Sequence, residues 1–472
     1  MKKFLLFLIL IVPLFTVSAQ QIRLKKGTVT DGIKVNDSLS ESFAVYLPTS
    51  FDPSQKWPVV FVFDMEGRGK QVLSMMLKVA EESGYLLAAS NAIKDSLSVS
   101  ENILISKRMV DGVLSLFPIH AQRMYTAGFA EGARFAGLVP VFLKQMTGVV
   151  SCGSSFPNTE ILSKRSPFHY IGIVGTEDFS YPDMVAQEGE FNRLNFPNNL
   201  LIFEGGNQWP PQEYLSMALE FFTLQAMAKG RVPKDSIFIK KAFRKNLNQV
   251  NKWTSLKKPI LALELLEELE STYRPLKDLD SLVPSKKALK RSKFFRSESR
   301  ERNAVFLRES LVKEDYSYYL EEDILTYNFN NLGWWKYQMD ELKKLDKSQK
   351  ASERQMGKRL GGFVNALIED NIDVVMANES VDKGALGFLY MLKTITDPKD
   401  YEYYKKVISL SSEIEDYGTA LFYLEELLKQ GYTDKKELYT LENTALLRIS
   451  PQFNTLLEKY LNESRYEIAP EN

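Results

Sequence analysis

The feature that most restricts the fold of this 472-residue chain is the stretch Gly128-Phe129-Ala130-Glu131-Gly132, which ends an apolar run and opens a helical pattern. Two glycines flank one small residue. In so tight a strand-to-helix turn, a side chain at either flanking position would collide with neighbouring backbone, so glycine is needed there. A turn of this type lifts its central residue above the end of the strand, and here that residue is Ala130.

From Gln20 to about Lys229, short apolar runs alternate with helical segments, which is typical of a parallel sheet with crossover helices. The expected strands are Phe43–Leu47, Pro58–Asp64, Tyr85–Ala89, Met124–Ala127, Gly148–Cys152, His169–Val174 and Asn199–Phe203. The expected helices are Lys70–Ser83, Asn102–Phe117, Glu131–Lys144 and one that follows Pro210-Pro211. We therefore predict an α/β domain over residues 20–232.

The alternation stops near Gly230, and residues 233–472 show amphipathic helices with almost no strand pattern. Asp416–Leu428 resembles the second helix of a tetratricopeptide repeat, with Asp400–Ser412 as the first, and Lys257–Leu269 resembles the same half-repeat more weakly. A regular period of repeats cannot be laid across the region. We expect an all-α domain of helical hairpins related to tetratricopeptide repeats, a kind of domain that commonly binds proteins.

Three places in the first part of the chain resemble the α/β-hydrolase superfamily, in particular its secreted esterases and polyester-depolymerase-like members. The first is the stretch around Ala130. The second is Gly175-Thr176-Glu177-Asp178 after a strand, and the third is Gly205-Gly206-Asn207-Gln208-Trp209 after the last strand. Their order along the chain is the family's order of nucleophile, acid and base. The resemblance implies an α/β-hydrolase-like, mostly parallel sheet with flanking helices.

The same resemblance assigns the triad positions to Ala130, Asp178 and Asn207, and an oxyanion-hole amide to Glu131. Alanine has no lone pair or proton to offer, and an asparagine amide does not titrate in a useful range, so it cannot act as general base. The triad is therefore degenerate, and no catalytic residue is assigned from the sequence.

No other side chain replaces the missing groups. The two histidines, His120 and His169, precede or begin strands, whereas the active site of a parallel sheet lies at the strands' carboxyl ends. Ser151, Ser154 and Ser155 follow a strand, but an unactivated serine is a poor nucleophile. We interpret them as loop residues.

Carboxylates leave one alternative open. The turn Asp64-Met65-Glu66-Gly67 stands where relatives place a glycine-rich oxyanion turn, and its acids would oppose a developing negative charge. These acids could support another reaction together with Asp178 or Glu131. The chain has no cluster of histidines and acids at metal-ligand spacing, so neither a metal nor a cofactor is expected.

A pocket lined by aromatic side chains can bind a ligand without transforming it. We expect Phe129, Asp178, Asn207 and Trp209 to line such a cleft and to take a small apolar or ester-like molecule. The alternative is that these aromatic rings only fill the core.

Residues 1–19 are typical of a secretory signal: Lys2 and Lys3 precede the apolar run Phe4–Phe15, and Ala19 ends a small-residue cleavage site. The run is too short for the roughly 20 residues of a membrane-spanning helix. We expect export to the periplasm or outside the cell, with no membrane span in the mature chain. The single cysteine, Cys152, excludes an intramolecular disulfide.

Charge gives little further direction, because 60 Lys and Arg residues balance 60 Asp and Glu residues. Nothing steers the chain to nucleic acid. The basic stretch Lys286–Arg302 is either a solvated helix face or the site of an anionic partner.

These observations predict an exported α/β-hydrolase-like protein that is catalytically inactive and acts as a binding or scaffolding module through its cleft and its helical domain. The alternative is an ester-bond hydrolase of the esterase type that uses unconventional catalytic groups.

Overall fold

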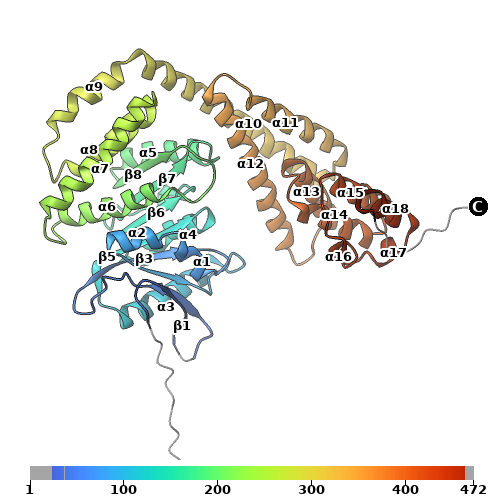
Figure 1. Cartoon of the computed structure of the whole chain (residues 1–472), viewed down its shortest axis with the longest axis horizontal. Helices are drawn as coiled ribbons and strands as arrows, with labels where there is room; N and C mark the ends of the chain where they lie inside the picture. Colours follow the sequence, from blue (N-terminus) through green and yellow to red (C-terminus); the bar gives the residue numbers. More distant parts are fainter. Residues whose placement is uncertain (1–23, 37, 463–472) are drawn as a thin grey trace, which may run out of the picture. The chain divides into compact units, whose positions relative to one another are not determined.

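The computed structural model describes residues 24–36 and 38–462. Its strands form one eight-stranded sheet in the order β1-β2-β4-β3-β5-β6-β7-β8 (Figure 1). After Phe203 the described secondary structure is entirely helical. The predicted fold class is confirmed: a mostly parallel sheet with flanking helices is followed by a long helical region. The predicted signal, residues 1–19, lies outside the described residues.

The chain divides into two compact units, Met1–His120 and Ala121–Asn472. The predicted boundary near residue 232 falls between two helices of the second unit and stays a prediction.

In the first unit, three strands form an antiparallel run β1-β2-β4, and β3 pairs with β4 in parallel. Residues 58–63 of β3 are fully buried, as its unbroken apolar sequence predicts. The unit contains β1 (Val29–Lys34), β2 (Ser42–Tyr46), β3 (Trp57–Phe63), α1 (Gly69–Ser74), α2 (Leu77–Ser83), β4 (Leu86–Ser90) and α3 (Val99–Leu116).

Two details of the first unit differ from expectation. Strand β1 was not predicted. The single helix expected over Lys70–Ser83 is two helices, because the backbone leaves the helical geometry at Met76 (φ −115°, ψ 0°). The apolar periodicity continues through Met75 and Met76, so the pattern of residues does not reveal the break.

In the second unit, β5 (Ile119–Phe129), β6 (Gly148–Cys152), β7 (His169–Gly175) and β8 (Asn198–Phe203) are parallel neighbours. The helices between and after them are α4 (Glu131–Phe142), α5 (Tyr181–Leu194) and α6 (Gln212–Ala228). Helix α5 was not predicted. Because all four strands run the same way, the residues that follow their carboxyl ends meet at one edge of the sheet.

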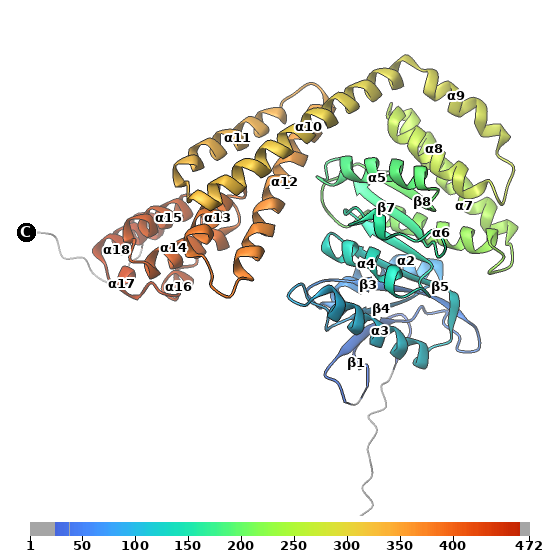
Figure 2. The ribbon, with the colours of Figure 1, turned by 180° about the vertical axis from the view of Figure 1, so that it is seen from behind.

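The rest of the second unit is helical. It contains α7 (Ser236–Ser255), α8 (Pro259–Tyr273), α9 (Val283–Arg291), α10 (Lys293–Thr326), α11 (Leu332–Leu345), α12 (Ala351–Met376), α13 (Lys383–Thr396), α14 (Tyr401–Glu413), α15 (Tyr417–Lys429), α16 (Lys435–Leu438), α17 (Ala445–Arg448) and α18 (Pro451–Leu461). Asp400 and Asp416 cap α14 and α15 through their side chains. Figure 2 shows α10, α11 and α12 side by side. A tetratricopeptide relationship stays a prediction.

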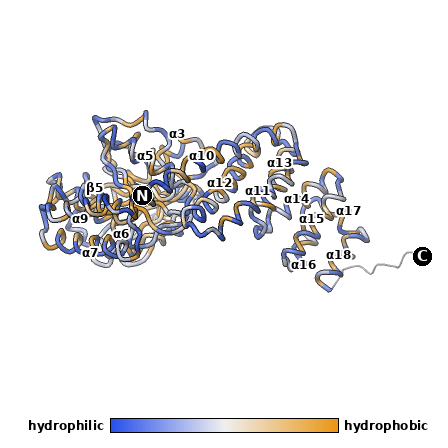
Figure 3. Tube along the Cα trace, turned by 90° about the horizontal axis from the view of Figure 1, so that it is seen from above, coloured by the Kyte–Doolittle hydropathy of each residue, from blue (hydrophilic) through white to orange (hydrophobic). Residues whose placement is uncertain are grey.

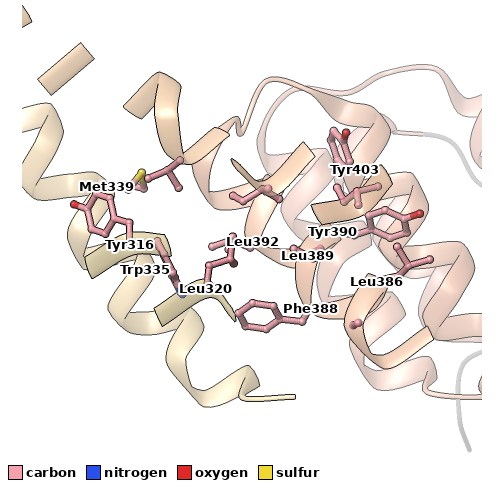
Figure 4. Packing of buried hydrophobic residues seen from close by; sticks show 14 of the residues in the cluster. Tyr316, Leu320, Trp335, Met339, Leu386, Phe388, Leu389, Tyr390, Leu392 and Tyr403 are labelled. Atoms are coloured by element: carbon pink, nitrogen blue, oxygen red, sulfur yellow. The ribbon is translucent and has the colours of Figure 1, made fainter. Parts of the chain in front are cut away.

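Figure 3 shows hydrophilic and hydrophobic segments alternating along these helices, as amphipathic packing requires. Their main core, seen in Figure 4, joins Tyr316 and Leu320 of α10 to Trp335 of α11 and Phe388 of α13. One polar group sits inside it: Asp323 accepts a hydrogen bond from the Trp335 Nε1–H at 2.8 Å. This bond fixes the ring's orientation while its apolar body packs.

Three cations of the basic stretch Lys286–Arg302 form ion pairs with carboxylates of α8. Glu267 of α8 forms ion pairs with Lys286 at 3.2 Å and with Lys290 at 2.6 Å. Arg302 forms an ion pair with Glu264. The other basic residues of the stretch, among them Lys293, Arg296 and Arg300, are exposed, so the choice between a solvated helix face and a site for an anionic partner stays open.

Helix α8 meets the sheet through a buried acidic contact. The carboxylate of Glu268 accepts a hydrogen bond from the Asn199 amide of β8, and it lies against Glu188 of α5. Burial raises the pKa of Glu268 well above its usual range, and the adjacent Glu188 raises it further. The pair therefore favours a protonated carboxyl at this junction.

Replacing Glu268 by Gln tests that protonation state. The folded pKa lies above the unfolded one, so the folded chain binds more protons, and stability falls as pH rises from about 4.5 upward. Glu268→Gln should remove that fall. Urea unfolding at pH 5 and pH 8 should show that the wild type loses more stability than the variant. The exposed Glu442→Gln is the matched control, and identical losses in wild type and Glu268→Gln would contradict the assignment.

Candidate functional site

The turn at Ala130 has the strained backbone that the sequence pattern predicts. Ala130 has φ 49° and ψ −120°, and it stands between the end of β5 and the start of α4. Its amide donates to the carbonyl of Cys152 at 3.0 Å, which ties the turn to β6. A Cβ built on Gly128 would lie 2.2 Å from the carbonyl oxygen of Gly132, so only glycine fits there.

The acid predicted after β7 is buried and hydrogen-bonded. Asp178 is 1% exposed, and its Oδ1 accepts the Ser180 amide at 2.8 Å. Its Oδ2 accepts a hydrogen bond from Asn207 Nδ2 at 3.2 Å. Two of the three predicted triad positions, 29 residues apart in the chain, are therefore in direct contact.

Backbone contacts hold the loops that carry these two side chains together. The amide of Glu177 donates to the carbonyl of Gly205 at 2.8 Å. A Cβ on Gly175 would lie 2.3 Å from that same carbonyl oxygen, so the loops approach as closely as backbone allows. Contacts between main chains thus help to place Asp178 and Asn207 beside each other.

The turn at Ala130 and the loop that carries Asp178 meet at Gly153, which follows β6. A Cβ there would lie 3.0 Å from Asp178 Oδ2 and 3.0 Å from a ring carbon of Phe129. The Phe129 ring in turn packs against Trp209, with ring centroids 5.8 Å apart. The four residues predicted to line a ligand cleft are therefore brought together at the carboxyl edge of β5, β6, β7 and β8.

Four cavities formed by described residues have other linings, and a role for Phe129, Asp178, Asn207 and Trp209 in binding a ligand stays a prediction.

The electrostatics of the site are those of desolvated acids. Burial raises the pKa of Asp178, while the hydrogen bonds from Ser180 and Asn207 oppose that rise. At the first turn of α4, desolvation raises the pKa of Glu131; Arg134 opposes the rise, and nearby α12 carboxylates add to it. Both carboxyls take up protons more readily than a free side chain does.

The residues that could replace the missing groups are engaged elsewhere. His169 begins β7 and Asp178 follows its end, so about 20 Å of strand separates them. Burial lowers the pKa of His169 to about 4, and its Nε2 is bonded to Asn199 Oδ1 at 2.7 Å. Ser151 Oγ donates to the carbonyl of Ser154 at 2.7 Å. The part of the chain that the structure describes brings no imidazole to Ala130.

Sequence reasoning missed the contribution of the helical region to this site. Three cationic side chains of helices α10 and α12 bind the loop that carries Asp178, residues 175–180. Lys313 Nζ donates to the carbonyl of Phe179 at 2.8 Å, Lys358 pairs with Glu177 at 2.8 Å, and Arg359 Nη1 donates to the carbonyl of Thr176 at 2.7 Å.

Among these three side chains, Arg359 joins α10, α12 and the loop. Its guanidinium forms a forked ion pair with Glu309 of α10, with nitrogen–oxygen distances of 2.7 and 3.0 Å. The two side chains are 2% and 1% exposed. The guanidinium also lies over the rings of Phe306, at 5.5 Å, and Tyr181, at 5.8 Å. In the sequence both charges look like ordinary members of helix surfaces, and only the fold shows that they are buried.

Within residues 24–36 and 38–462, no group of three or more His, Cys, Asp or Glu side chains could hold a metal ion. In the same described part of the chain, no helix has the length and apolar character needed to cross a membrane.

Comparison with known proteins gives structural likeness only. No family profile and no curated protein matches the sequence. Among solved structures, S-formylglutathione hydrolase from Staphylococcus aureus matches with 11% identity over 41% of this chain and 97% of its own, at a TM-score of 0.34. A ferulic acid esterase matches with 15% identity over 42% and 97%, at 0.33. Esterase 2 of Thermogutta terrifontis matches with 11% identity over 45% and 98%, at 0.35.

The positive φ of Ala130 predicts an unusual response to glycine. A non-glycine residue in such a region costs about 1–3 kcal/mol, which exceeds glycine's entropic cost of about 0.5–1 kcal/mol. Ala130→Gly should therefore raise the free energy of unfolding by about 1 kcal/mol, measured in urea. In the exposed interior of α10, Ala304→Gly should instead lower it by a similar amount. A loss of stability in both variants would show that the turn is unstrained.

The buried ion pair predicts a second, larger effect. Arg359→Met leaves Glu309 buried, with only Lys313 at 3.9 Å nearby, and should lower the free energy of unfolding by about 3 kcal/mol. Lys358→Met removes an exposed pair from the same helix and should cost less than about 1 kcal/mol. Adding Glu309→Leu to Arg359→Met should recover most of the loss. Equal effects of the two single variants in urea unfolding would contradict the burial argument.

Proposed function

We propose that this chain is an exported α/β-hydrolase-like protein that has lost acyl-transfer chemistry and acts by binding. One observation carries the proposal: Asn207 donates a hydrogen bond to the buried Asp178, at the position where the resemblance places a catalytic histidine. The frame of the site is kept while the residue that would move protons is absent.

The chemistry of the remaining groups supports this proposal. Attack on an ester needs a hydroxyl or thiol nucleophile and a base whose pKa is near neutral. At the turn between β5 and α4, Ala130 supplies no nucleophile. Burial raises the pKa of the neighbouring Cys152 thiol, so this thiol stays protonated. The amide of Asn207 holds the position of a base without accepting a proton.

Binding would involve the helical region as well as the sheet edge. Helices α10 and α12 fix the loop that carries Asp178, so a partner that binds these helices would act on the same surface as a ligand beside Phe129 and Trp209. A protein partner for the helical region and a small apolar or ester-like ligand at the sheet edge are the two occupants that we propose.

A second candidate is an ester hydrolase that uses carboxyl groups. The observation that favours it is the raised pKa of Asp178 and Glu131, since a protonated carboxyl can act as general acid. Such an enzyme would lose its activity in Asp178→Asn or Glu131→Gln.

Rebuilding the triad tests the first candidate. The purified wild type should hydrolyse short-chain aryl esters no faster than buffer does. Ala130→Ser combined with Asn207→His should give measurable turnover, because the two changes supply a nucleophile and a base on a frame that already holds the acid. Each single variant should stay near the background, since the members of a triad act as a unit.

Two further measurements separate the candidates. Adding Asp178→Asn to the double variant should lower its rate by at least about tenfold, because the acid orients the imidazole. Wild-type turnover that disappears in Asp178→Asn would instead contradict the inactive assignment and support the carboxyl mechanism.

A further inference from the structure

Helix α10 carries an apolar stripe that nothing in the described chain covers. Leu307, Leu311, Tyr318 and Leu325 are each more than half exposed. Their intervals of four, seven and seven residues place them on one side of this 34-residue helix, in the spacing of a coiled-coil seam. The opposite side of α10 packs into the helical core through Tyr316 and Leu320.

The charges beside the stripe are segregated by sign. Exposed basic residues occupy the first third of the same face, and exposed acidic residues lie in its second half. The basic residues are Lys293, Arg296 and Arg300, and the acidic residues are Glu314, Glu321 and Glu322. Between residues 24 and 462, leaving out residue 37, no ion pair within the chain involves any of these six, although ion pairs are frequent elsewhere on the helices.

This segregation is unfavourable within one helix. The amino-terminal end of a helix carries partial positive charge and the carboxyl-terminal end partial negative charge, so basic residues at the start and acidic residues at the end oppose the helix dipole. A second helix that runs antiparallel reverses both effects, because its acidic end lies beside the basic end of the first. Exposed leucines at the centre of the face would be buried by the same contact.

We propose that this face of α10 binds α10 of a second copy of the chain in an antiparallel, two-fold symmetric dimer. With the two-fold axis beside residue 309, Leu307 faces the partner's Leu311, Arg300 faces the partner's Tyr318, and Arg296 faces the partner's Glu322. Every contact occurs twice, as an isologous interface requires. This register brings the leucines of the two copies together and the basic half of each face beside the acidic half of the other, and this complementarity of charge favours a second copy as the occupant.

Charge reversal with rescue tests the pairing. Sedimentation equilibrium of the mature chain should show a monomer–dimer equilibrium that weakens as salt is raised. Arg296→Glu and Glu322→Arg should each raise the dissociation constant about tenfold, because each places two like-charge pairs in the dimer. The double variant should return it to near the wild-type value.

The rescue cannot arise within one chain. Arg296 and Glu322 are 26 residues apart on α10, which corresponds to about 39 Å along the helix axis. Arg244→Glu, an exposed charge reversal on α7, is the control and should leave the dissociation constant unchanged. Leu311→Glu should abolish the dimer while circular dichroism stays that of the wild type.

Three results would overturn the proposal. These are a wild type that stays monomeric up to about 200 µM, a dimer that Leu311→Glu does not affect, and a double charge reversal that is weaker than either single one. If the stripe binds a different protein instead, the wild type should stay monomeric.

Discussion

Close contact between backbones is the constraint on which the rest of the site depends. The turn at Ala130 closes because Gly128 has no side chain to collide with the carbonyl of Gly132, and the loop of Asp178 lies against the loop of Asn207 because Gly175 meets the carbonyl of Gly205. Main chain in contact with main chain tolerates no added atom, whereas a side chain that points into the site can change without moving the frame. Side chains at this sheet edge, such as Ala130 and Asn207, can therefore differ from those of a related protein without a change in the backbone around them.

The helical region adds a second level of constraint. Through Arg359 and Lys313 it binds backbone carbonyls of the loop that carries Asp178, so two parts of the chain that are far apart in sequence fix one loop. A buried ion pair is a poor source of net stability, because desolvating two charges offsets most of their attraction. Its value here is orientational, since the fork of Glu309 and Arg359 allows one arrangement of α10, α12 and the loop.

Much of this fold could be predicted from the sequence, because its strands and turns are specified by residues that are close together in the chain. Apolar runs such as Pro58–Phe63 can only be buried strands, and the glycine spacing around Ala130 indicates the strand-to-helix turn. The contact between Asp178 and Asn207 agrees with the order of the three motifs. Helix α5 was missed because its pattern is weakly amphipathic, and the role of Arg359 could not be found at all, since charge and spacing give no sign of burial.

The position of Arg359 also bears on whether this protein can be cut into independent parts. Its partners are Glu309, 50 residues away, and the carbonyl of Thr176, 183 residues away, so its burial depends on a sheet loop and two helices being assembled together. A fragment that begins after α6 would carry the guanidinium and its carboxylate without the loop that encloses them. Cutting the chain there would remove a hydrogen-bond acceptor from a buried cation, so the helical region should be less stable alone than in the whole chain.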